Sequence, residues 1–398
     1  MVVDQRTGLL VDSLNFSDPV ARARELGPAV AAAAAAIESA QRIGEPLLSE
    51  LHKSRLLRML MPRSVGGDQI EPQTYFMAVE EIARHDASVG WIVFVANSAA
   101  LIAAFLDDEA ARTIFADARS VVAWGPPNAT RALAVAGGYR LTGTWEFASG
   151  CRHATWMGAH CHVSEADGSL RLNRQGRPTI RTLLFPVRQA TVLDTWNVIG
   201  MRGTGSESYS VADVFVPEAF STTREDPTLR REPGPLYAFT MQGLYATGVA
   251  AVALGTARAM LDALVALASR KSPRGLERLA DNAVVQAEVA RAEARLAAAR
   301  AYLIEALSST YARADDAEPI DLADRARVRL AAVNAIHGAL EVATFSYRAA
   351  GVDAIYPSGP FERRFRDIHT LSQQIQARAQ HFEVVGQILL GRPPEVFF

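Results

Sequence analysis

The chain has 398 residues, of which 49% are hydrophobic, and its formal charge at pH 7 is -2. A chain of this length and composition buries a large core and divides into two or three domains. The near-neutral charge leaves no excess of basic side chains to neutralise phosphates, which excludes nucleic acid as an expected partner.

The N-terminal segment lacks the basic region and apolar core of a secretory signal, so we expect a cytoplasmic protein. The longest apolar run, residues 89–106, is long enough to raise the question of a membrane span. Gly90, Asn97 and Ser98 interrupt this run, and acidic residues flank it at both ends. We therefore predict a buried helix and no membrane association.

The first 118 residues are predicted to form an N-terminal α-helical domain. Asp18 and Pro19 supply an N-cap acceptor followed by proline at the first helical position. The third helix, opened by Pro72, is expected to turn Glu80 and Arg84 towards solvent. Helices are expected over residues 20–43, 46–60 and 87–106, from residue 72 onwards, and after a cap at Asp107 or Asp108 through residue 115.

Residues 119–226 change to a composition rich in Val, Thr, Trp and Gly with period-two alternation. This pattern predicts a central β domain, a barrel or sandwich. Strands are expected over residues 120–124, 139–147, 155–163, 179–185, 191–198 and 209–216.

Residues 227–398 return to helical periodicity, with helices expected over residues 236–270, 276–312, 319–348 and 361–390. Four long helices joined by short loops predict an antiparallel four-helix bundle, and the width of the apolar stripes indicates burial against other subunits. The fold class is therefore α+β, with a β domain between two helical domains.

The two cysteines, Cys151 and Cys161, fit a reducing compartment rather than a disulfide framework. Three histidines lie nearby, but strand alternation separates His160 and His162 from Cys161, and the spacing matches no zinc motif. No metal site is expected.

Residues 137–151, which read GGYRLTGTWEFASGC, form the most informative stretch. Alternation places Tyr139, Leu141, Gly143, Trp145 and Phe147 on one side of a strand. The strand ends at Ala148-Ser149-Gly150, which puts a hydroxyl and exposed backbone N–H groups beside the flat surface of Trp145. This arrangement suits a planar heteroaromatic ring such as a flavin. An amphipathic strand with core aromatics and an ordinary turn explains the same pattern.

The order of domains and several words of the sequence resemble the acyl-CoA dehydrogenase fold family. The words are ASVGWIVF, GGYRLTGTWEFASGC, WNVIGMRGTGSESYSVADVFVP and FERRFRDIHT, and they span nearly the whole chain. Within this family, the W-x-F-x-S-G word ending at Gly150 is similar to that of the two-component (group D) flavin-dependent monooxygenases. Gln374-Ile375-Gln376 stands where the dehydrogenases carry an E-G-T word with their glutamate base.

The resemblance implies an oxygenase that takes reduced flavin from a separate reductase, forms a C4a-hydroperoxide with oxygen and hydroxylates a small aromatic or polycyclic substrate. The dehydrogenases' Q-x-x-G-G-x-G word is replaced by residues 348–354, which favours reduced FMN, with FAD possible. A homotetramer is implied, with the bundle serving oligomerisation and flavin binding. The alternatives are an FAD-containing dehydrogenase or oxidase, and a non-catalytic flavin-binding scaffold.

The residues that the resemblance places at the flavin are Trp124, Asn128, Trp145, Phe147, Ala148, Ser149, Trp196 and Arg270. Ser149 is also a catalytic candidate, since its hydroxyl and backbone N–H are expected to bond either the N5/C4 edge or the distal oxygen of a hydroperoxide. Trp124 is expected to wall the ring, with Asn128 at its pyrimidine side. Arg270, next to Lys271, is expected to reach the flavin phosphate of a neighbouring subunit. The glycine-rich turn at residues 202–206 is near the ring edge in the family, but it is too generic to predict a phosphate loop.

Proton transfer is assigned to the last helix. Many of the monooxygenases carry a histidine where this chain has Gln374, and glutamine cannot exchange a proton near neutral pH. His369 is the replacement candidate, because imidazole titrates near pH 7. The alternatives are that the chemistry needs no base or that the substrate supplies one. His85 and Trp91 are expected at a substrate pocket between the helical and β domains. A structural role fits each of these side chains as well, and Arg366-Asp367 is expected to be an ion pair.

Overall fold

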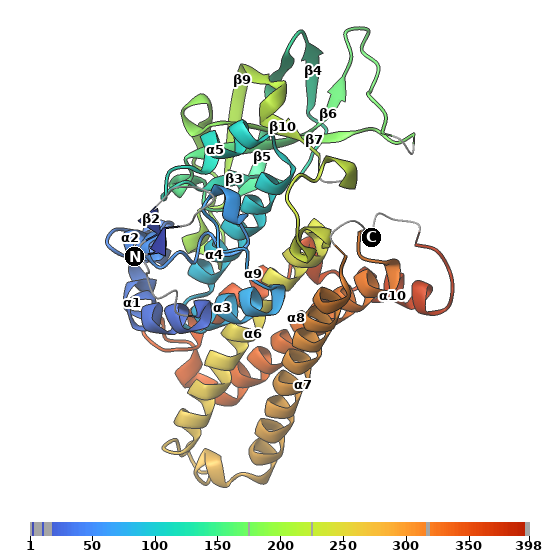
Figure 1. The fold of residues 1–398 in the computed structure, drawn as a ribbon. Coiled ribbons are helices and arrows are strands. Elements are labelled where there is room, and N and C mark those ends of the chain that lie inside the picture. Colours follow the sequence, from blue (N-terminus) through green and yellow to red (C-terminus); the bar gives the residue numbers. More distant parts are fainter. Residues whose placement is uncertain are drawn as a thin grey trace.

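The computed structural model describes the backbone of residues 2–3 and 10–11, and residues 18–173, 176–223, 226–315 and 319–394 in full. The helices of the N-terminal segment lie against one end of a large sheet, and the long C-terminal helices extend away from both (Figure 1). The last N-terminal helix ends at Phe115 and the first strand of the large sheet begins at Val122. The domain boundaries at residues 118 and 226 stay predictions.

The N-terminal helices are α1 (Pro19–Ala40), α2 (Leu47–Lys53), α3 (Pro72–His85), α4 (Ala87–Ala100) and α5 (Asp108–Phe115). The predicted start of α1 is confirmed, since the Asp18 carboxylate accepts from the Val20 N–H at 3.2 Å. Asp86 and Asp107 cap α4 and α5 in the same way. The helix expected over residues 46–60 is shorter than predicted, because Arg55 has a φ of 61° and the chain leaves α2 as turns.

Glu80 is buried, which contradicts the outward orientation predicted from the α3 pattern. Its carboxylate accepts from Nε of Arg300 on α7 (Ala283–Arg313) at 2.8 Å. Burial raises the pKa of Glu80, and the Arg300 charge opposes that shift. Because Arg300, which lies far along the chain, pairs with it, Glu80 can lie on the buried face of α3.

Among the described residues, two segments are long and apolar enough to cross a membrane by length and composition, Ala87–Phe105 and Met241–Ala268. The first comprises α4 and a 3-10 turn, Leu101–Phe105, and 94% of its apolar window lies inside the protein. The second is α6 (Met241–Ala268), which crosses α3 so closely that a Cβ on Gly255 would lie 2.3 Å from the Glu80 carbonyl oxygen. The prediction of a buried helix after residue 87 is confirmed.

The large sheet has eight strands in the order β10-β7-β6-β4-β5-β9-β8, with β3 paired to β6. β3 and β4 run parallel to β6, and the other pairs are antiparallel. Each predicted strand is present, although the strand expected over residues 191–198 ends at Leu193, and β4 and β10 were not predicted. The strands are β3 (Val122–Trp124), β4 (Arg131–Val135), β5 (Gly138–Ala148), β6 (Trp156–Ser164), β7 (Ile180–Pro186), β8 (Thr191–Leu193), β9 (Glu207–Pro217) and β10 (Ser221–Thr222); β1 (Val2–Val3) pairs with β2 (Leu10–Val11) separately.

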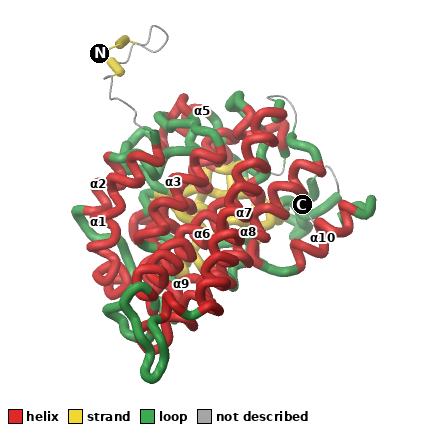
Figure 2. Tube along the Cα trace, turned by 90° about the horizontal axis from the view of Figure 1, so that it is seen from below, coloured by secondary structure: helices red, strands yellow, loops and turns green. Residues whose placement is uncertain are grey.

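The C-terminal segment comprises α6, α7, α8 (Leu322–Ala350), α9 (Glu362–Leu371) and α10 (Gln380–Leu389). Figure 2 shows α6, α7 and α8 side by side, and α9 and α10 pack on α8. The prediction of one continuous fourth bundle helix over residues 361–390 is wrong. The helix ends at Leu371, and a 3-10 turn follows at Ile375–Ala377. α10 then packs back on α8 through Val385 and Ala326.

Candidate functional site

A β-bulge near the end of β5 separates the two aromatic side chains that alternation had placed on one face. The register with β9 shifts between Trp145 and Ala148, and Phe147 adopts a φ of 60°. Trp145 is 0% exposed, donates its indole N–H to the His160 carbonyl and stacks on Tyr209. Phe147 is 56% exposed. The extra residue flips the alternation, so Trp145 belongs to the core of the β domain and cannot face a ligand.

Phe147 and Trp196 form an aromatic pair at this end of the sheet, with ring centroids 6.2 Å apart. Trp196 is half-buried and held on three sides. Its indole N–H donates to the Met201 carbonyl at 3.0 Å, its backbone N–H donates to Glu207, and its carbonyl accepts from Gln41 on the segment after α1. The pair offers a fixed aromatic surface that is partly open to solvent.

Glu207 fixes the segment that carries Trp196. Its buried carboxylate accepts from the N–H groups of Thr195 and Trp196 at 2.7 and 2.8 Å, and from Arg152. Burial alone would raise the pKa of Glu207, but these hydrogen bonds outweigh it and the pKa lies below its ordinary value. Glu207 is therefore ionised at neutral pH.

Ser149 lies in a chain of hydrogen bonds between the helical and β domains. The Trp91 indole N–H donates to Ser149 Oγ at 3.1 Å, and Ser149 Oγ lies 2.6 Å from Ser206 Oγ. Ser206 Oγ lies 2.7 Å from Thr204 Oγ1, which donates to the Met201 carbonyl. The structure thus brings together two residues predicted at the site, Ser149 and Trp91, and adds two that the sequence argument did not select.

The backbone N–H groups predicted to be exposed at this turn are engaged. The Ser149 N–H donates to the Phe147 carbonyl at 2.9 Å, and the Gly150 N–H donates to the Thr204 carbonyl at 3.0 Å. Ala148, which was predicted to contact the flavin, is fully buried in the β-domain core. The polar group that the turn offers to a ligand is therefore the Ser149 hydroxyl.

The glycine-rich turn at residues 202–206 is shaped by packing. A Cβ on Gly203 would lie 2.4 Å from Ile37 Cγ2 of α1. Gly205 has a φ of 47°, and a Cβ there would lie 2.5 Å from the Gln41 carbonyl oxygen. The glycines allow the turn to dock against α1, which places Thr204 and Ser206 beside Ser149. The sequence Thr204-Gly205-Ser206, in which a glycine separates two hydroxyl residues, was the signal that could have predicted this contact with Ser149.

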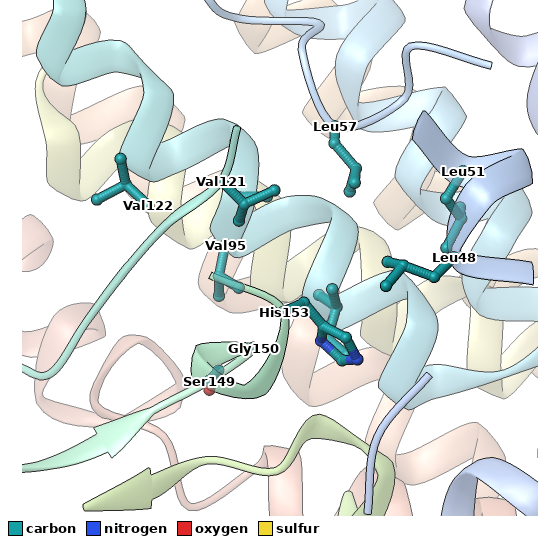
Figure 3. A pocket seen from close by; sticks show the side chains of 11 residues that line it. Leu48, Leu51, Leu57, Val95, Val121, Val122, Ser149, Gly150 and His153 are labelled. Carbon is teal, nitrogen blue, oxygen red and sulfur yellow. The ribbon is translucent and has the colours of Figure 1, made fainter. Parts of the chain in front are cut away.

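A small apolar cavity of about 10 Å³ adjoins Ser149, room for about one water molecule (Figure 3). Side chains of α2, α4, β3 and the turn after β5 line it: Leu48, Leu51, Leu57, Ile92, Val95, Ala96, Val121, Val122, Ser149, Gly150 and His153. His153 Nε2 lies 3.0 Å from the Ile43 nitrogen, and its buried Nδ1 has no hydrogen-bond partner among the described residues. Burial lowers the pKa of His153, which keeps the ring neutral.

Cys151 and Cys161 are buried in the β-domain core as free thiols. Burial raises the pKa of Cys151 to about 11 and that of Cys161 to about 12, so both stay protonated. Within the described ranges, no group of three or more His, Cys, Asp or Glu side chains is placed to hold a metal ion.

Trp124 ends β3 and Asn128 lies in the loop that follows, and both side chains make contacts within the β domain. The Trp124 ring packs over Gly158 and meets the His160 ring at 4.8 Å. The Asn128 amide donates to the Thr144 carbonyl at 2.8 Å, and its oxygen accepts from the Thr130 N–H. The predicted contact of Asn128 with the flavin stays a prediction, since both ends of its amide already hold the turn.

His85 lies at the crossing of α1 and α3 rather than along the Ser149 cavity. A Cβ on Gly27 would lie 2.3 Å from His85 Nε2, and Glu81 is 3.8 Å from the same atom. Burial lowers the pKa of His85. The glycine in α1 makes room for the imidazole, which supports a packing role for His85.

His369 and Gln374 do not meet Ser149. His369 packs against Phe365, with Thr344 Oγ1 3.4 Å from its Nε2, and burial lowers its pKa. It lines a groove of about 430 Å³ between α8 and α9 that shares no residue with the Ser149 cavity. Gln374 caps the turn after α9, since its side-chain oxygen accepts from the Gln376 N–H at 2.6 Å. Their proton-transfer roles stay predictions.

Arg270 and Lys271 end α6 in different environments. Arg270 is exposed, and its side chain makes no hydrogen bond or ion pair within the described part of the chain. Lys271 donates to the Ala350 carbonyl and pairs with Asp353. Of these two cations, Arg270 is therefore the one available to an external anion.

Arg366 and Asp367 do not pair with each other, which contradicts the expected ion pair. Arg366 bridges Glu38 and Glu362 and donates to the Ile199 carbonyl at 2.6 Å. The buried Asp367 accepts from the Met201 N–H at 2.6 Å. Burial, together with the nearby charge of Asp86, raises the pKa of Asp367 to about 7. α9 thus anchors the segment that carries Trp196.

Comparison with known proteins places the chain in a family. Residues 21–118 match the acyl-CoA dehydrogenase N-terminal domain and residues 247–378 match the acyl-CoA dehydrogenase C-terminal domain. An indole-3-acetate monooxygenase of Pseudomonas putida is 30% identical, covering 96% of this chain and 99% of that protein. The oxygenase component of an FADH2-dependent resorcinol hydroxylase of Rhizobium sp. is 27% identical, covering 90% of both.

The solved structure of XiaF from Streptomyces sp. in complex with FADH2 and glycerol superposes with a TM-score of 0.86 at 25% identity, covering 96% of this chain and 97% of that one. Family models, full-length relatives and fold agree on the same assignment. The chain belongs to the acyl-CoA dehydrogenase-fold family, in its branch of flavin-dependent monooxygenase oxygenase components.

Proposed function

We propose that this chain is the oxygenase component of a two-component monooxygenase, which receives reduced FMN or FAD from a separate reductase and hydroxylates a small aromatic or polycyclic substrate. The observation that carries the proposal is the end of β5, where an exposed Phe147 pairs with a half-buried Trp196 and lies two residues before Ser149, whose hydroxyl accepts from Trp91. The relatives named as oxygenase components support the division of labour with a reductase.

The residues present fit a flavin. A positive φ holds the Phe147 ring out of the core, where its apolar face has room to cover an isoalloxazine. Ser149 supplies a hydroxyl for the polar edge of the ring, and Trp196 is immobilised beside it by Glu207 and Met201. Aromatic surface with one adjacent polar group is what a planar heteroaromatic cofactor requires.

A bound reduced flavin would supply the activation of molecular oxygen. The chain's own residues hold the ring, exclude water and orient the substrate. The cavity beside Ser149 is suited to exclude water, since leucine, valine and isoleucine side chains dominate its wall. His153 is suited to orient the substrate, since its unpartnered Nδ1 offers a polar contact to a substrate oxygen or nitrogen.

The cavity must enlarge before it admits an aromatic ring, because its volume is about 10 Å³. Leu48 and Leu51 lie on the seven-residue helix α2, and Leu57 lies in the turns that follow it. We infer that these three side chains move to admit substrate. An apolar wall with a single imidazole favours a mainly hydrocarbon ring that carries one polar group.

A dehydrogenase is disfavoured by the composition of this cavity. Removal of a proton next to a thioester carbonyl needs a carboxylate base in reach of the flavin. No Asp or Glu is among the residues that line the Ser149 cavity in the described structure. The buried Asp367 is engaged by the Met201 N–H instead.

We propose further that the protein is a cytoplasmic homotetramer, with Arg270 of one subunit holding the flavin phosphate of another. The exposed guanidinium at the end of α6 supports that role. Large apolar side chains exposed on and around the C-terminal helices support association: Val265, Leu276, Val284, Val352, Ile355, Tyr356, Ile375, Leu389 and Leu390.

The proposal is tested by mixing the purified chain with enzymatically reduced FMN or FAD under ¹⁸O₂, using indole-3-acetate, resorcinol and indole as probe substrates. We expect a product that is heavier by one ¹⁸O atom and no colour change with acyl thioesters. Bleaching of a tightly bound flavin by an acyl thioester, with no ¹⁸O in any product, would establish the dehydrogenase instead.

A further inference from the structure

The short helix α2 forms one wall of the Ser149 cavity. Its Leu48 and Leu51 side chains lie across the cavity from Val121 (Figure 3). Of the seven residues of α2, only Leu47 and Leu51 are buried, so the rest of this helix lies at or near the surface. A surface helix that places apolar side chains over a small cavity has the form of a lid.

The C-terminal end of α2 is a fixed point. The Ser54 carbonyl accepts from the Arg22 guanidinium at 2.7 Å, and the same guanidinium donates to Asp68 at 2.9 Å. Arg55, where the chain turns away from α2 with a φ of 61°, also donates to Asp68, at 2.8 Å. The Asp68 carboxylate therefore ties the end of α2 to the body of the helical domain.

The chain enters α2 through Gly44. The residue before it, Ile43, is held because its N–H donates to His153 Nε2 at 3.0 Å. A Cβ on Gly44 would meet no atom within 4 Å, and glycine has the widest range of backbone angles. With both flanks anchored, α2 can leave the cavity by rotating about the line that joins the two anchors.

Arg119, two residues before the cavity wall at Val121, holds α2 in the closed position. Its guanidinium donates to Glu45 Oε1 at 2.7 Å and to Ser49 Oγ at 3.0 Å. The other Glu45 oxygen accepts from the Ser49 N–H at 3.1 Å, so the first turn of α2 and Arg119 share one network. The Arg119 and Glu45 side chains are 49% and 54% exposed. An ion pair this open to water is weak, which suits a contact that has to break at every turnover.

We propose, resting on the proposed function of this site, that α2 is a lid that swings outward to admit the aromatic substrate and that Arg119 latches it shut through Glu45. Opening moves the α2 leucines away from the cavity, and closing returns them and excludes water. Arg119 is a positioning residue, since it touches the lid and not the ligand.

Hydrogen exchange read by mass spectrometry measures the opening without flavin or substrate, because the α2 amides exchange when the helix opens. Arg119→Ala and Glu45→Gln break the latch, whereas Arg119→Lys keeps a cation for Glu45. The matched control is Arg140→Ala, which removes a 47% exposed side chain paired with Asp213 near the opposite end of β5 from Ser149. A second readout is the association rate constant of indole, measured anaerobically by stopped flow on the protein loaded with reduced FMN.

We expect the α2 amides to exchange about two- to fivefold faster in Arg119→Ala and Glu45→Gln than in the wild type, with Arg140→Ala and Arg119→Lys close to the wild type. The association rate constant of indole should rise by the same factor in the two latch variants. Exchange in α2 that neither latch variant changes, or an increase spread over the whole chain, overturns the inference.

Faster exchange in α2 with an unchanged association rate constant of indole overturns α2 as the entry route. If the wild type binds none of indole, resorcinol and indole-3-acetate while exchange in α2 responds as expected, the latch stands and the proposed function of the site is overturned.

Discussion

At the end of β5, neighbouring aromatic residues have opposite roles. Trp145 is fully buried with its indole N–H bonded to the His160 carbonyl, and Phe147 is exposed at a positive φ. A side chain that is held out of a core at the expense of backbone strain is best explained by a ligand that covers it. The bulge between the two residues thus gives the candidate site its exposed aromatic ring.

Alanine substitutions at Phe147 and at Trp145 are expected to affect different quantities, flavin affinity in the first case and the free energy of unfolding in the second. Phe147→Ala is expected to change the free energy of unfolding by less than about 0.5 kcal/mol, because the ring is largely exposed, and to weaken reduced FMN binding several-fold. Trp145→Ala should lower the free energy of unfolding by about 3–5 kcal/mol, because it leaves a cavity in the core. Urea denaturation and anaerobic titration measure the two quantities. Strong destabilisation by Phe147→Ala with unchanged flavin affinity would count against a ligand at this ring.

The sequence selected some residues that the structure brings into contact, but it missed the local geometry around them. Ser149 and Trp91 were selected from the sequence and lie in hydrogen-bond contact. The orientation of Phe147 was missed, because a bulge is invisible to a period-two pattern. Thr204 and Ser206 were passed over, because only docking of the glycine turn against α1 brings them to Ser149.

At the scale of elements, α9 acts as an anchor for the segment that carries Trp196. Asp367 accepts from the Met201 N–H, and Arg366 reaches the Ile199 carbonyl. A Cβ on Gly200 would lie 2.2 Å from the Arg366 carbonyl oxygen, so the segment runs directly over the helix backbone. The position of Trp196 therefore depends on α9. The bond between Met201 and Asp367, which makes this connection, joins residues that are 166 positions apart in the sequence.

The raised pKa of Asp367 gives this anchor a pH signature. Between the ordinary value of 3.8 and the folded value of about 7, the folded state keeps a proton that the unfolded state has lost. The stabilisation is present at low pH and is lost as pH rises through that window, by up to about 1.4 kcal/mol per pH unit. Besides Met201, the groups that influence this carboxyl are Asp86, Arg363 and Glu38.

Asp367→Asn should therefore flatten the fall of unfolding free energy between pH 4.5 and 6.5. Asp194→Asn is the matched control, because Asp194 is a highly exposed partner of Arg152. Chemical denaturation at several pH values measures the slope. A slope that is the same in wild type and in both variants would show that Asp367 is ionised throughout.

Helix starts were predictable, because Asp18, Asp86 and Asp107 cap helices through local bonds. The break after α9 was not predictable, because tertiary contacts hold it open. The His337 ring lies 2.8 Å from the Ala377 carbonyl, and the buried Arg329 bonds Gln376. Both partners belong to α8, and His337 contacts a backbone carbonyl that a continuous helix would have paired internally.

At the scale of the whole molecule, the site forms where three parts of the chain meet. The helical domain contributes Trp91 and the leucines of the cavity, the sheet contributes Phe147 and Ser149, and α9 anchors the Trp196 segment. The domain order was predictable from the change of periodicity alone. Contacts between subunits depend on surfaces that a single chain does not place, so Arg270 stays a prediction at that level.

The central claim is that flavin binds at the exposed end of β5. A crystal structure of the protein with FMN bound under reducing, anaerobic conditions tests it most directly. We expect the isoalloxazine ring against Phe147, with a ring nitrogen within 2.7–3.2 Å of Ser149 Oγ. Flavin density elsewhere on the molecule, with Phe147 still exposed and no flavin atom near Ser149, would contradict the account.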